Sequence, residues 1–453
     1  MKLVEVPFHY YPDAVGGTEV YTASLTRELM RLGMEVEIAA PGAAEEQYVH
    51  DGVPVHRFTP RPQVDDLSEL YGIGDSVAAE QFRRILDRTQ PDLVHLHAMS
   101  PAVSLLVVRE IKRRDLPVVF TYHIPGITCP RGTLLRYSRS VCDGVWGLHK
   151  CSRCALEAHG LAKPLSQIVG SLPPAVGRAA RALGGRGRAA TVLRMTELQA
   201  LRQRTLTAFL AEVDHIVAVS QWVREMLVRN GVPETKVTVC RHGRTQAVGA
   251  GSRPPRRTGA HLPRPLRLAF IGRLNAAKGL HVLVEALLQL PRLPVLLDIY
   301  GVVQGSAGES YKGDLARRAS GDSRISFLPA LPQKEVVACL AEYDALAVPS
   351  QWMETGPLVV YDAFAAAIPV IGADRGGIAE LVEHERDGLL VETSNVAAWA
   401  AAIHRLAGDR ELLGRLRDGV RPPRTMAAVA TEMRMLYERA LSGAGDRQLC
   451  ASS

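Results

Sequence analysis

The sequence contains no long hydrophobic run. Its apolar segments, such as the serine-interrupted one from Ala102 to Val108, fall far short of the about 20 residues that a helix needs to cross a bilayer. Near the N-terminus, Glu5, Pro7 and His9 interrupt the apolar stretch that a signal peptide requires. We therefore expect a protein without a membrane-spanning helix that works in the cytoplasm.

Nothing in the composition points to a disordered or fibrous protein. Of the 453 residues, 47% are hydrophobic and 22% are charged, which is typical of a globular protein. At about 150 residues per domain, the length predicts two or three domains. The formal net charge of +7 is too small to identify a binding partner by itself. No Gly-x-Gly-x-x-Gly occurs, which argues against a nicotinamide-dependent enzyme.

Short apolar segments alternate with amphipathic segments along most of the chain. This alternation is typical of an α/β fold with parallel, doubly wound sheets. A stretch rich in Pro, Gly and Arg interrupts it near the middle, which predicts a linker between two Rossmann-like domains. The segments expected to form strands are 2–7, 34–40, 92–97, 116–122, 215–220 and 236–240 before the linker, and 266–272, 295–301, 325–328, 345–349 and 370–372 after it.

The same pattern predicts the domain organisation. The last helical segment is long enough to pack back on the N-terminal domain, and the residues after it are expected to form a flexible tail. The expected parts are an N-terminal domain at 1–245 with an insertion at about 124–211, a linker at 246–266, a C-terminal domain at 267–420, the helical segment at 421–441 and the tail at 442–453.

Polar residues and glycine follow the strand expected at 345–349. In open parallel sheets, ligands bind beyond the carboxyl ends of the strands. The sequence continues Ser-Gln-Trp-Met-Glu-Thr-Gly-Pro, and a helix that opens at Pro357 would direct free N–H groups toward an anion. Asp362 lies in the otherwise apolar start of that helix, where a buried carboxylate needs a partner. A ribose diol, which donates two O–H groups, would be such a partner.

Basic residues and glycines follow other expected strands. Arg273 and Lys278 come after the first strand of the second domain, so both charges can meet on a diphosphate whose charge grows as it leaves. Gly16 and Gly17 follow the first strand of the chain and allow a ligand to approach the backbone closely. His123 comes directly after another strand of the first domain. We expect these residues to line one site.

The segment from Ser350 to Asp362, continued by 368–372 and 376–380, resembles the acid-x7-acid signature of retaining glycosyltransferase family 4. The Arg273 and Lys278 element and the N-terminal Gly-Gly-Thr-Glu are similar to that family as well. The resemblance implies the GT-B architecture, in which two Rossmann-like domains face each other across a cleft. It also implies a nucleotide-diphospho-sugar donor, and transfer of its sugar to an acceptor hydroxyl with retention at the anomeric carbon.

This resemblance also implies a role for each site residue. Glu354 would contact hydroxyls of the donor sugar, Asp362 the ribose, and the turn after Glu354 the phosphates. Arg273 and Lys278 would hold the diphosphate, and His123 would lie near the donor sugar and the acceptor. The catalytic residues so implied are His123, Glu354, Arg273 and Lys278, and the donor-binding residues are Gly16, Gly17, Arg273, Lys278, Glu354, Thr355, Gly356, Pro357, Leu358 and Asp362.

The chain departs from the family pattern at two places. Asp362 stands where glutamate is usual and is one methylene shorter, so its ribose contact would be longer or bridged by water. Gly356 and Pro357 stand where many members have Phe-Gly, a variant associated with members that build polysaccharides. Glycolipids and other glycoconjugates stay open as products, with a glycan, a lipid-linked molecule or a small molecule as acceptor. No Asp-x-Asp pair occurs, so we expect no catalytic divalent metal.

Four of the seven cysteines lie close together after His123. Cys129, Cys142, Cys151 and Cys154 have the spacing C-x12-C-x8-C-x2-C, which is typical of a closed tetrahedral zinc site. An iron–sulfur cluster uses the same ligands, but the unequal spacing lacks the compact ferredoxin pattern. We expect a structural zinc ion that shapes acceptor recognition, with an iron–sulfur cluster as the alternative.

The segment at 155–211 carries most of the positive charge. It contains eight Lys and Arg residues against two Glu residues, an excess of six out of the total of +7. Interleaved apolar residues make parts of it amphipathic. It is expected either to form a solvated face or to contact an anionic membrane, where a peripheral protein on the inner membrane face would meet a lipid-linked acceptor.

Two functions of other classes stay open. A nucleotide-sugar epimerase shares the two-domain architecture but needs no acceptor. A basic, zinc-bearing nucleic-acid binder would need exposed aromatic residues for base stacking, and residues 162–204 contain none, so we expect no nucleic-acid partner. His95 and His97 point to the same face of a strand and, with no acidic residue nearby, are expected to be structural.

Overall fold

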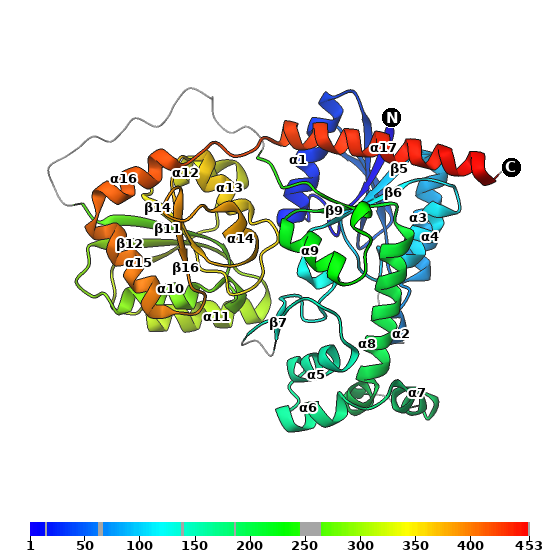
Figure 1. The fold of residues 1–453 in the computed structure, drawn as a ribbon, viewed down its shortest axis with the longest axis horizontal. Coiled ribbons are helices and arrows are strands. Elements are labelled where there is room, and N and C mark those ends of the chain that lie inside the picture. The colour runs from blue at the N-terminus through cyan, green and yellow to red at the C-terminus, as the bar shows by residue number, and fades with distance from the viewer. Residues whose placement is uncertain (14–15, 62–66, 137–139, 185–186, 245–263, 452–453) are drawn as a thin grey trace. The chain divides into compact units, whose positions relative to one another are not determined.

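The computed structural model describes residues 1–13, 16–61, 67–136, 140–184, 187–244 and 264–451 (Figure 1). The chain divides into two units, Met1–Arg241 with Met426–Ser453, and His242–Thr425. Most of the linker expected at 246–266 lies outside the described residues. Among the described residues, no helix is both long and apolar enough to cross a membrane.

The first unit is built on an eight-stranded sheet in which β1 lies between β5 and β2. Its strands pair in parallel except for β3, which forms an antiparallel hairpin with β4. That hairpin was not predicted, although Asp51 and Gly52 at its turn are a known hairpin signal. In sheet order the strands are β10 (Val237–Val239), β9 (His215–Ala218), β6 (Val118–Tyr122), β5 (Leu93–Leu96), β1 (Lys2–Val6), β2 (Glu35–Pro41), β4 (Val53–Phe58) and β3 (Glu46–His50).

The C-terminal helix α17 (Met426–Ala451) belongs to this first unit and contacts α1 (Gly17–Arg31). Apolar residues of α17, among them Met433 and Tyr437, share a core with Leu25 and Leu29 of α1. The helix continues past the expected boundary at Leu441, and no proline interrupts it there.

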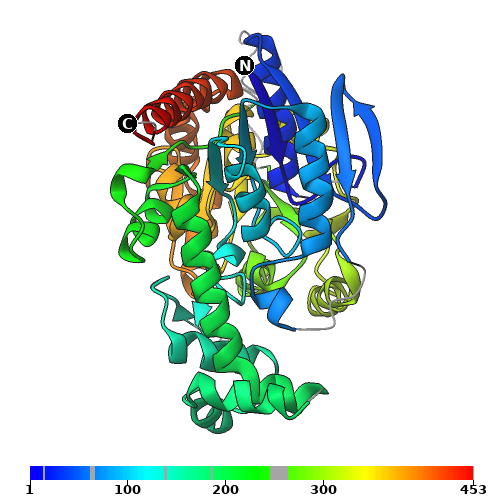
Figure 2. The same ribbon diagram turned by 90° about the vertical axis from the view of Figure 1, so that its right-hand side faces the viewer.

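Four helices form the insertion that precedes β9. Helix α8 (Gly187–Glu212) contacts α5 (Leu148–Ala158) and α7 (Pro174–Ala182), which with α6 (Lys163–Val169) gather at one end of it (Figures 1 and 2). Its last turns supply Leu206, Phe209 and Leu210 to the core of the first unit. Two short strands, β7 (Leu135–Arg136) and β8 (Ser140–Val141), form a small hairpin ahead of α5.

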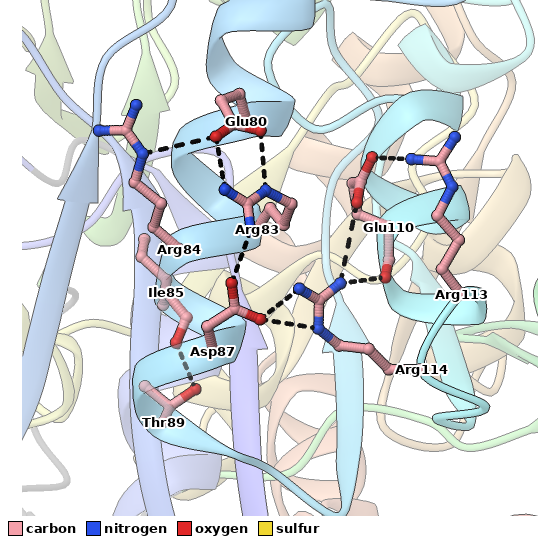
Figure 3. Close-up of polar contacts among 9 residues, drawn as sticks. All are labelled: Glu80, Arg83, Arg84, Ile85, Asp87, Thr89, Glu110, Arg113 and Arg114. Atoms are coloured by element: carbon pink, nitrogen blue, oxygen red, sulfur yellow. Dashed lines mark hydrogen bonds and ion pairs between the residues drawn. The ribbon is translucent and has the colours of Figure 1, made fainter.

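Helices α3 (Ser76–Thr89) and α4 (Leu105–Lys112) of the first unit are joined by surface ion pairs (Figure 3). Arg114 contacts both Asp87 and Glu110, and Arg83 contacts Glu80 and Asp87. The Arg83 side chain lowers the pKa of Glu80 to about 2. Such exposed pairs contribute little to stability, so the fold of this region depends on the apolar contacts beneath them.

The second unit contains a six-stranded parallel sheet in which β11 lies between β12 and β14. The prediction of an α/β fold with two parallel sheets is confirmed, although β16 was missed. The strands in sheet order are β13 (Ile325–Leu328), β12 (Val295–Val302), β11 (Leu266–Arg273), β14 (Ala345–Val348), β15 (Val370–Ala373) and β16 (Gly388–Val391). The helices include α10 (Leu280–Leu288), α11 (Gly305–Arg318), α12 (Val336–Leu340), α13 (Leu358–Ala365), α14 (Gly376–Leu381), α15 (Val396–Gly408) and α16 (Arg410–Gly419).

Candidate active site

The loops after β11 and β14 touch at the carboxyl edge of the second sheet. Asn275 accepts a hydrogen bond from the backbone N–H of Lys278 (3.1 Å) and so shapes the turn after Arg273. The next residue, Gly279, has a positive φ of 72°, and a Cβ there would lie only 1.8 Å from the carbonyl oxygen of Pro349. Only glycine allows this approach, which brings the basic loop against the loop that follows β14.

A part-buried ion pair joins these two loops. The Lys278 Nζ lies 2.6 Å from Oε1 of Glu354, and the Ser350 hydroxyl donates to the same oxygen at 2.7 Å. Burial opposes ionisation of Glu354, but the Lys278 charge and these hydrogen bonds outweigh it and hold the pKa of Glu354 below its usual value. Glu354 is therefore a carboxylate at neutral pH, fixed in place by its neighbours.

Both predicted cations lie near the ring of Trp352. The Lys278 ammonium is 5.2 Å from the ring centroid, and the Arg273 guanidinium is 6.0 Å from it. These distances lie within about the 6 Å range of cation–π attraction. The sequence did not single out Trp352, although it stands two residues before Glu354. Both positive charges thus lie close to one aromatic ring beyond the end of β11.

The turn from Glu354 to Pro357 is held by close backbone contacts with α14. The Gly377 N–H donates to the Glu354 carbonyl (2.7 Å), and a Cβ on Gly377 would lie 2.6 Å from the Thr355 carbonyl oxygen. Helix α13 begins at Leu358 rather than at Pro357, because Pro357 has an extended backbone (ψ 103°) and takes the N-cap position. This places Thr355, Gly356 and Pro357 in an ordered turn directly before the helix.

Asp362 lies on α13 with only 4% of its surface exposed. Its Oδ1 is 2.8 Å from Nε of Arg244, a partner that the sequence did not identify. Burial raises the pKa of Asp362 to about 6, and the Arg244 charge and a Gln333 hydrogen bond limit the rise. His242 donates from Nδ1 to the carbonyl oxygen of Gly356 (3.1 Å). The basic run from Arg241 to Arg244, directly after β10, was the signal that sequence reasoning overlooked.

The remaining predicted site residues lie in the first unit. Gly16 is the N-cap of α1, and Gly17 is the first residue of that helix, which follows β1. His123 comes directly after β6, is 4% exposed, and has its Nε2 3.0 Å from Nδ1 of His97. These three residues therefore lie near the carboxyl ends of strands in the first sheet, whereas the other donor residues lie in the second unit.

The expectation that no acid lies near His95 and His97 is wrong. Oε1 of Glu5 is 3.9 Å from Nδ1 of His95 and 3.8 Å from Nε2 of His97, because Glu5 on β1 pairs with His95 on β5. Burial, and then the neighbouring histidines, hold the pKa of His95 well below its usual value. His95 also contacts the Tyr437 hydroxyl (2.8 Å) and the Thr121 hydroxyl (2.7 Å). The ring is therefore neutral and held at both nitrogens.

Comparison with known families identifies both halves of the chain. The model "Glycosyl transferase 4-like domain" matches residues 16–243, which is half of the chain, and the model "Glycosyl transferases group 1" matches residues 256–421. The chain belongs to the glycosyltransferase 4-like family. Both regions that carry the candidate site residues lie within these matches, and the resemblance seen in the sequence is confirmed at the level of the family.

Curated relatives of this chain include several D-inositol 3-phosphate glycosyltransferases. One from Corynebacterium efficiens is 35% identical over 188 residues, which cover 40% of this chain and 44% of the relative. One from Pseudarthrobacter chlorophenolicus is 26% identical over 405 residues, which cover 87% of this chain and 82% of the relative. The match to the first of these spans less than half of the relative's length.

Solved structures similar to this chain share its fold at low sequence identity. Sucrose-phosphate synthase from Thermosynechococcus elongatus has a TM-score of 0.66 at 19% identity and covers 100% of both chains. Anabaena HepE in complex with UDP and glucose has a TM-score of 0.62 at 16% identity and covers 97% of this chain and 100% of its own. Together with the two Rossmann-like sheets, these neighbours establish the GT-B architecture.

Proposed function

We propose that this glycosyltransferase moves a sugar from a nucleotide-diphospho-sugar to an acceptor hydroxyl, with retention at the anomeric carbon. The observation that carries the proposal is the part-buried Lys278–Glu354 pair at the carboxyl edge of the second sheet, with Arg273 near the ring of Trp352. Ligands of open parallel sheets bind at this edge. A structural neighbour, Anabaena HepE, was solved with UDP and glucose.

Each residue of the second unit has a role in this proposal. Arg273 and Lys278 bind the diphosphate and stabilise its growing negative charge as it leaves. Glu354 accepts hydrogen bonds from hydroxyls of the donor sugar. Asp362, which is buried beside Arg244, binds the ribose. The turn formed by Thr355, Gly356, Pro357 and Leu358 lies before α13 and contacts the phosphates.

The chemical step exchanges one bond at the anomeric carbon. The bond from this carbon to the diphosphate oxygen breaks, and a bond to the acceptor oxygen forms on the same face of the sugar. The acceptor hydroxyl proton passes to the departing diphosphate oxygen. His123 contacts the donor sugar and the acceptor, and Gly16 and Gly17 contact the donor through their backbone. Arg273 and Lys278 supply the positive charge that a divalent metal provides in other glycosyltransferases.

The acceptor is a glycan, a lipid-linked molecule or a small molecule, and the product a polysaccharide, a glycolipid or another glycoconjugate. Helix α6 supports the lipid-linked form, because Leu165 and Ile168 are 52% and 65% exposed beside Lys163. Exposed apolar residues flanked by basic ones favour an anionic membrane surface. Co-sedimentation with vesicles that contain anionic lipid tests this contact, and equal recovery with neutral vesicles argues against it.

Thermal denaturation with nucleoside diphosphates tests the donor site. Because the nucleotide binds the folded state only, one of the uridine, guanosine or adenosine diphosphates should raise the Tm. Arg273→Ala should abolish this shift. Arg292→Ala, which removes an exposed arginine of the same unit, should keep it. No shift with any of the three nucleotides would contradict the proposed donor site.

A further inference from the structure

All four clustered cysteines line one small cavity in the first unit. Cys129 follows the short helix η1 (Pro125–Ile127), Cys142 follows β8, and Cys151 and Cys154 lie on α5. The cavity that they share has a volume of about 30 Å³. Three separate segments, the loop after η1, the β7–β8 hairpin and α5, therefore each direct at least one thiol into the same space.

Basic side chains surround this cavity. Lys150 lines it, and Arg131 donates to the carbonyl oxygen of Cys154 (3.1 Å). Arg202 of α8 lines an adjoining cavity together with Cys151. It donates from Nη2 to the carbonyl oxygens of Gly126 (2.7 Å) and Ile127 (3.2 Å). A cation is thus held between the backbone of η1 and the thiols.

We propose that the four cysteines bind one Zn²⁺ ion as thiolates and that Arg202 is the counter-charge of this centre. On binding, each thiol releases one proton to solvent, and four Zn–S bonds form. Four thiolates and one Zn²⁺ carry a net charge of about −2, which is costly to bury without a neighbouring cation. The contacts of Arg202 with η1 then join the zinc centre to the segment that begins at His123.

The spacing of the four cysteines favours a single zinc ion, because it lacks the compact ferredoxin pattern of iron–sulfur proteins. Among the described residues, the three metal-ligating side chains whose ligand atoms all lie within 4.8 Å of one another are Glu5, His95 and His97. No three of the four thiols meet this criterion, so zinc binding must draw them together.

The thiols have room for such a movement. Cys142 Sγ lies 3.5 Å from a carboxylate oxygen of Asp143, and Cys154 Sγ lies 4.0 Å from the Leu135 carbonyl oxygen. Both are weak contacts that a rotation of the cysteine side chain replaces with a metal bond. The Glu5 group is a poorer candidate, because His95 already has both ring nitrogens in hydrogen bonds.

Elemental analysis of the purified full chain, with its absorption spectrum, tests the site. We expect about one zinc ion per chain and no visible absorption band. Cys142→Ser and Cys151→Ser should each lose the zinc, whereas Cys339→Ser, which changes a cysteine of the second unit, should retain it. Iron with a visible band would overturn the zinc assignment, and metal-free protein that takes up no added Zn²⁺ would overturn the site itself.

Competition with a zinc chelator tests the role of Arg202. Arg202→Met should weaken zinc binding by about 10- to 100-fold, as loss of an outer-shell partner does in other metal sites. Arg204→Met removes an exposed arginine two residues further along α8 and should leave zinc affinity unchanged. Equal affinities in both variants would contradict the assignment of Arg202.

One part of this inference rests on the proposed function, namely that the zinc centre supports the segment that begins at His123. Zinc content and chelator affinity are measured without substrate, so they stand if the protein proves to have no glycosyl transfer activity. The nucleoside diphosphate shift of the Tm reports on the second unit separately. Loss of zinc with a retained nucleotide shift would support the cysteine site as a distinct centre of the first unit.

Discussion

Asp362 is buried on α13, and its position makes its ionisation costly. Arg244 lies 2.8 Å away and compensates part of the cost, but the pKa still rises to about 6. An unfolded aspartate has a pKa of about 3.9. Between these two values the folded protein binds a proton that the unfolded chain has lost. Raising the pH through this range therefore destabilises the folded protein.

Replacing Asp362 by asparagine should remove this pH dependence. Relative to Asp362→Asn, the wild-type Tm should fall as the pH rises from about 4.5 to about 6.5 and then stay constant. Calorimetry of both proteins across this range measures the difference. Asp314→Asn changes a half-exposed carboxylate on α11 and should track the wild type. A constant difference between wild type and Asp362→Asn would contradict the raised pKa.

The sequence revealed the acidic and basic residues of the second unit but not all of their partners. Glu354 and Lys278 each follow a buried strand, and the carboxyl ends of parallel strands share one edge, so their proximity was predictable. Arg244 belongs to the second unit but precedes the expected linker in the chain, and the basic run around it does not indicate which carboxylate it reaches. The Glu5–His95 contact depends on the strand order, which a local pattern does not contain.

At the level of elements, α17 completes the first unit although it follows the second unit in the chain. Val429, Ala430 and Met433 are fully buried against residues of α1 and the sheet. Tyr437 adds a hydrogen bond to His95 on β5. The helix thus covers apolar surface of the first unit that would otherwise meet water, and it contributes to the stability of that unit.

Two methionines on α17 provide a matched test of this packing. Met433 is fully buried and Met435 is 48% exposed. Met433→Ala should destabilise the first unit by about 2–5 kcal/mol, because it leaves a cavity, and should lower its Tm. Met435→Ala should change the Tm far less. Similar calorimetric shifts for both variants would show that α17 does not pack on the unit in solution.

Strand and helix prediction succeeded where periodicity was strong and failed where turn chemistry decided the structure. Most buried strands of both sheets are apolar runs whose positions agree with the sequence pattern, with β16 as an apolar strand that was missed. The β3–β4 hairpin was missed because its strands contain charged residues and proline, so its main signal is the Asp51-Gly52 turn. The insertion does not alternate strands with helices. The arrangement of α5 and α7 depends instead on their contacts with α8.

For the whole molecule, the family match and the two parallel sheets agree on the GT-B architecture. The alternation of strands and helices was enough to predict two Rossmann-like domains. The donor base, the sugar and the acceptor depend on side chains that line the bound ligand, and one sequence pattern does not determine them. The central claim is therefore the reaction class, which the part-buried Glu354–Lys278 pair supports.

Turnover of a panel of nucleotide sugars tests this claim most directly. Purified protein is incubated with uridine, guanosine and adenosine diphospho-sugars, and release of nucleoside diphosphate is measured. The account predicts release from at least one donor, reduced about 100-fold or more by Glu354→Gln and unchanged by Glu309→Gln, an exposed residue of α11. Isomerised nucleotide sugar without diphosphate release would indicate an epimerase, and no turnover of any donor, or turnover unaffected by Glu354→Gln, would contradict the account.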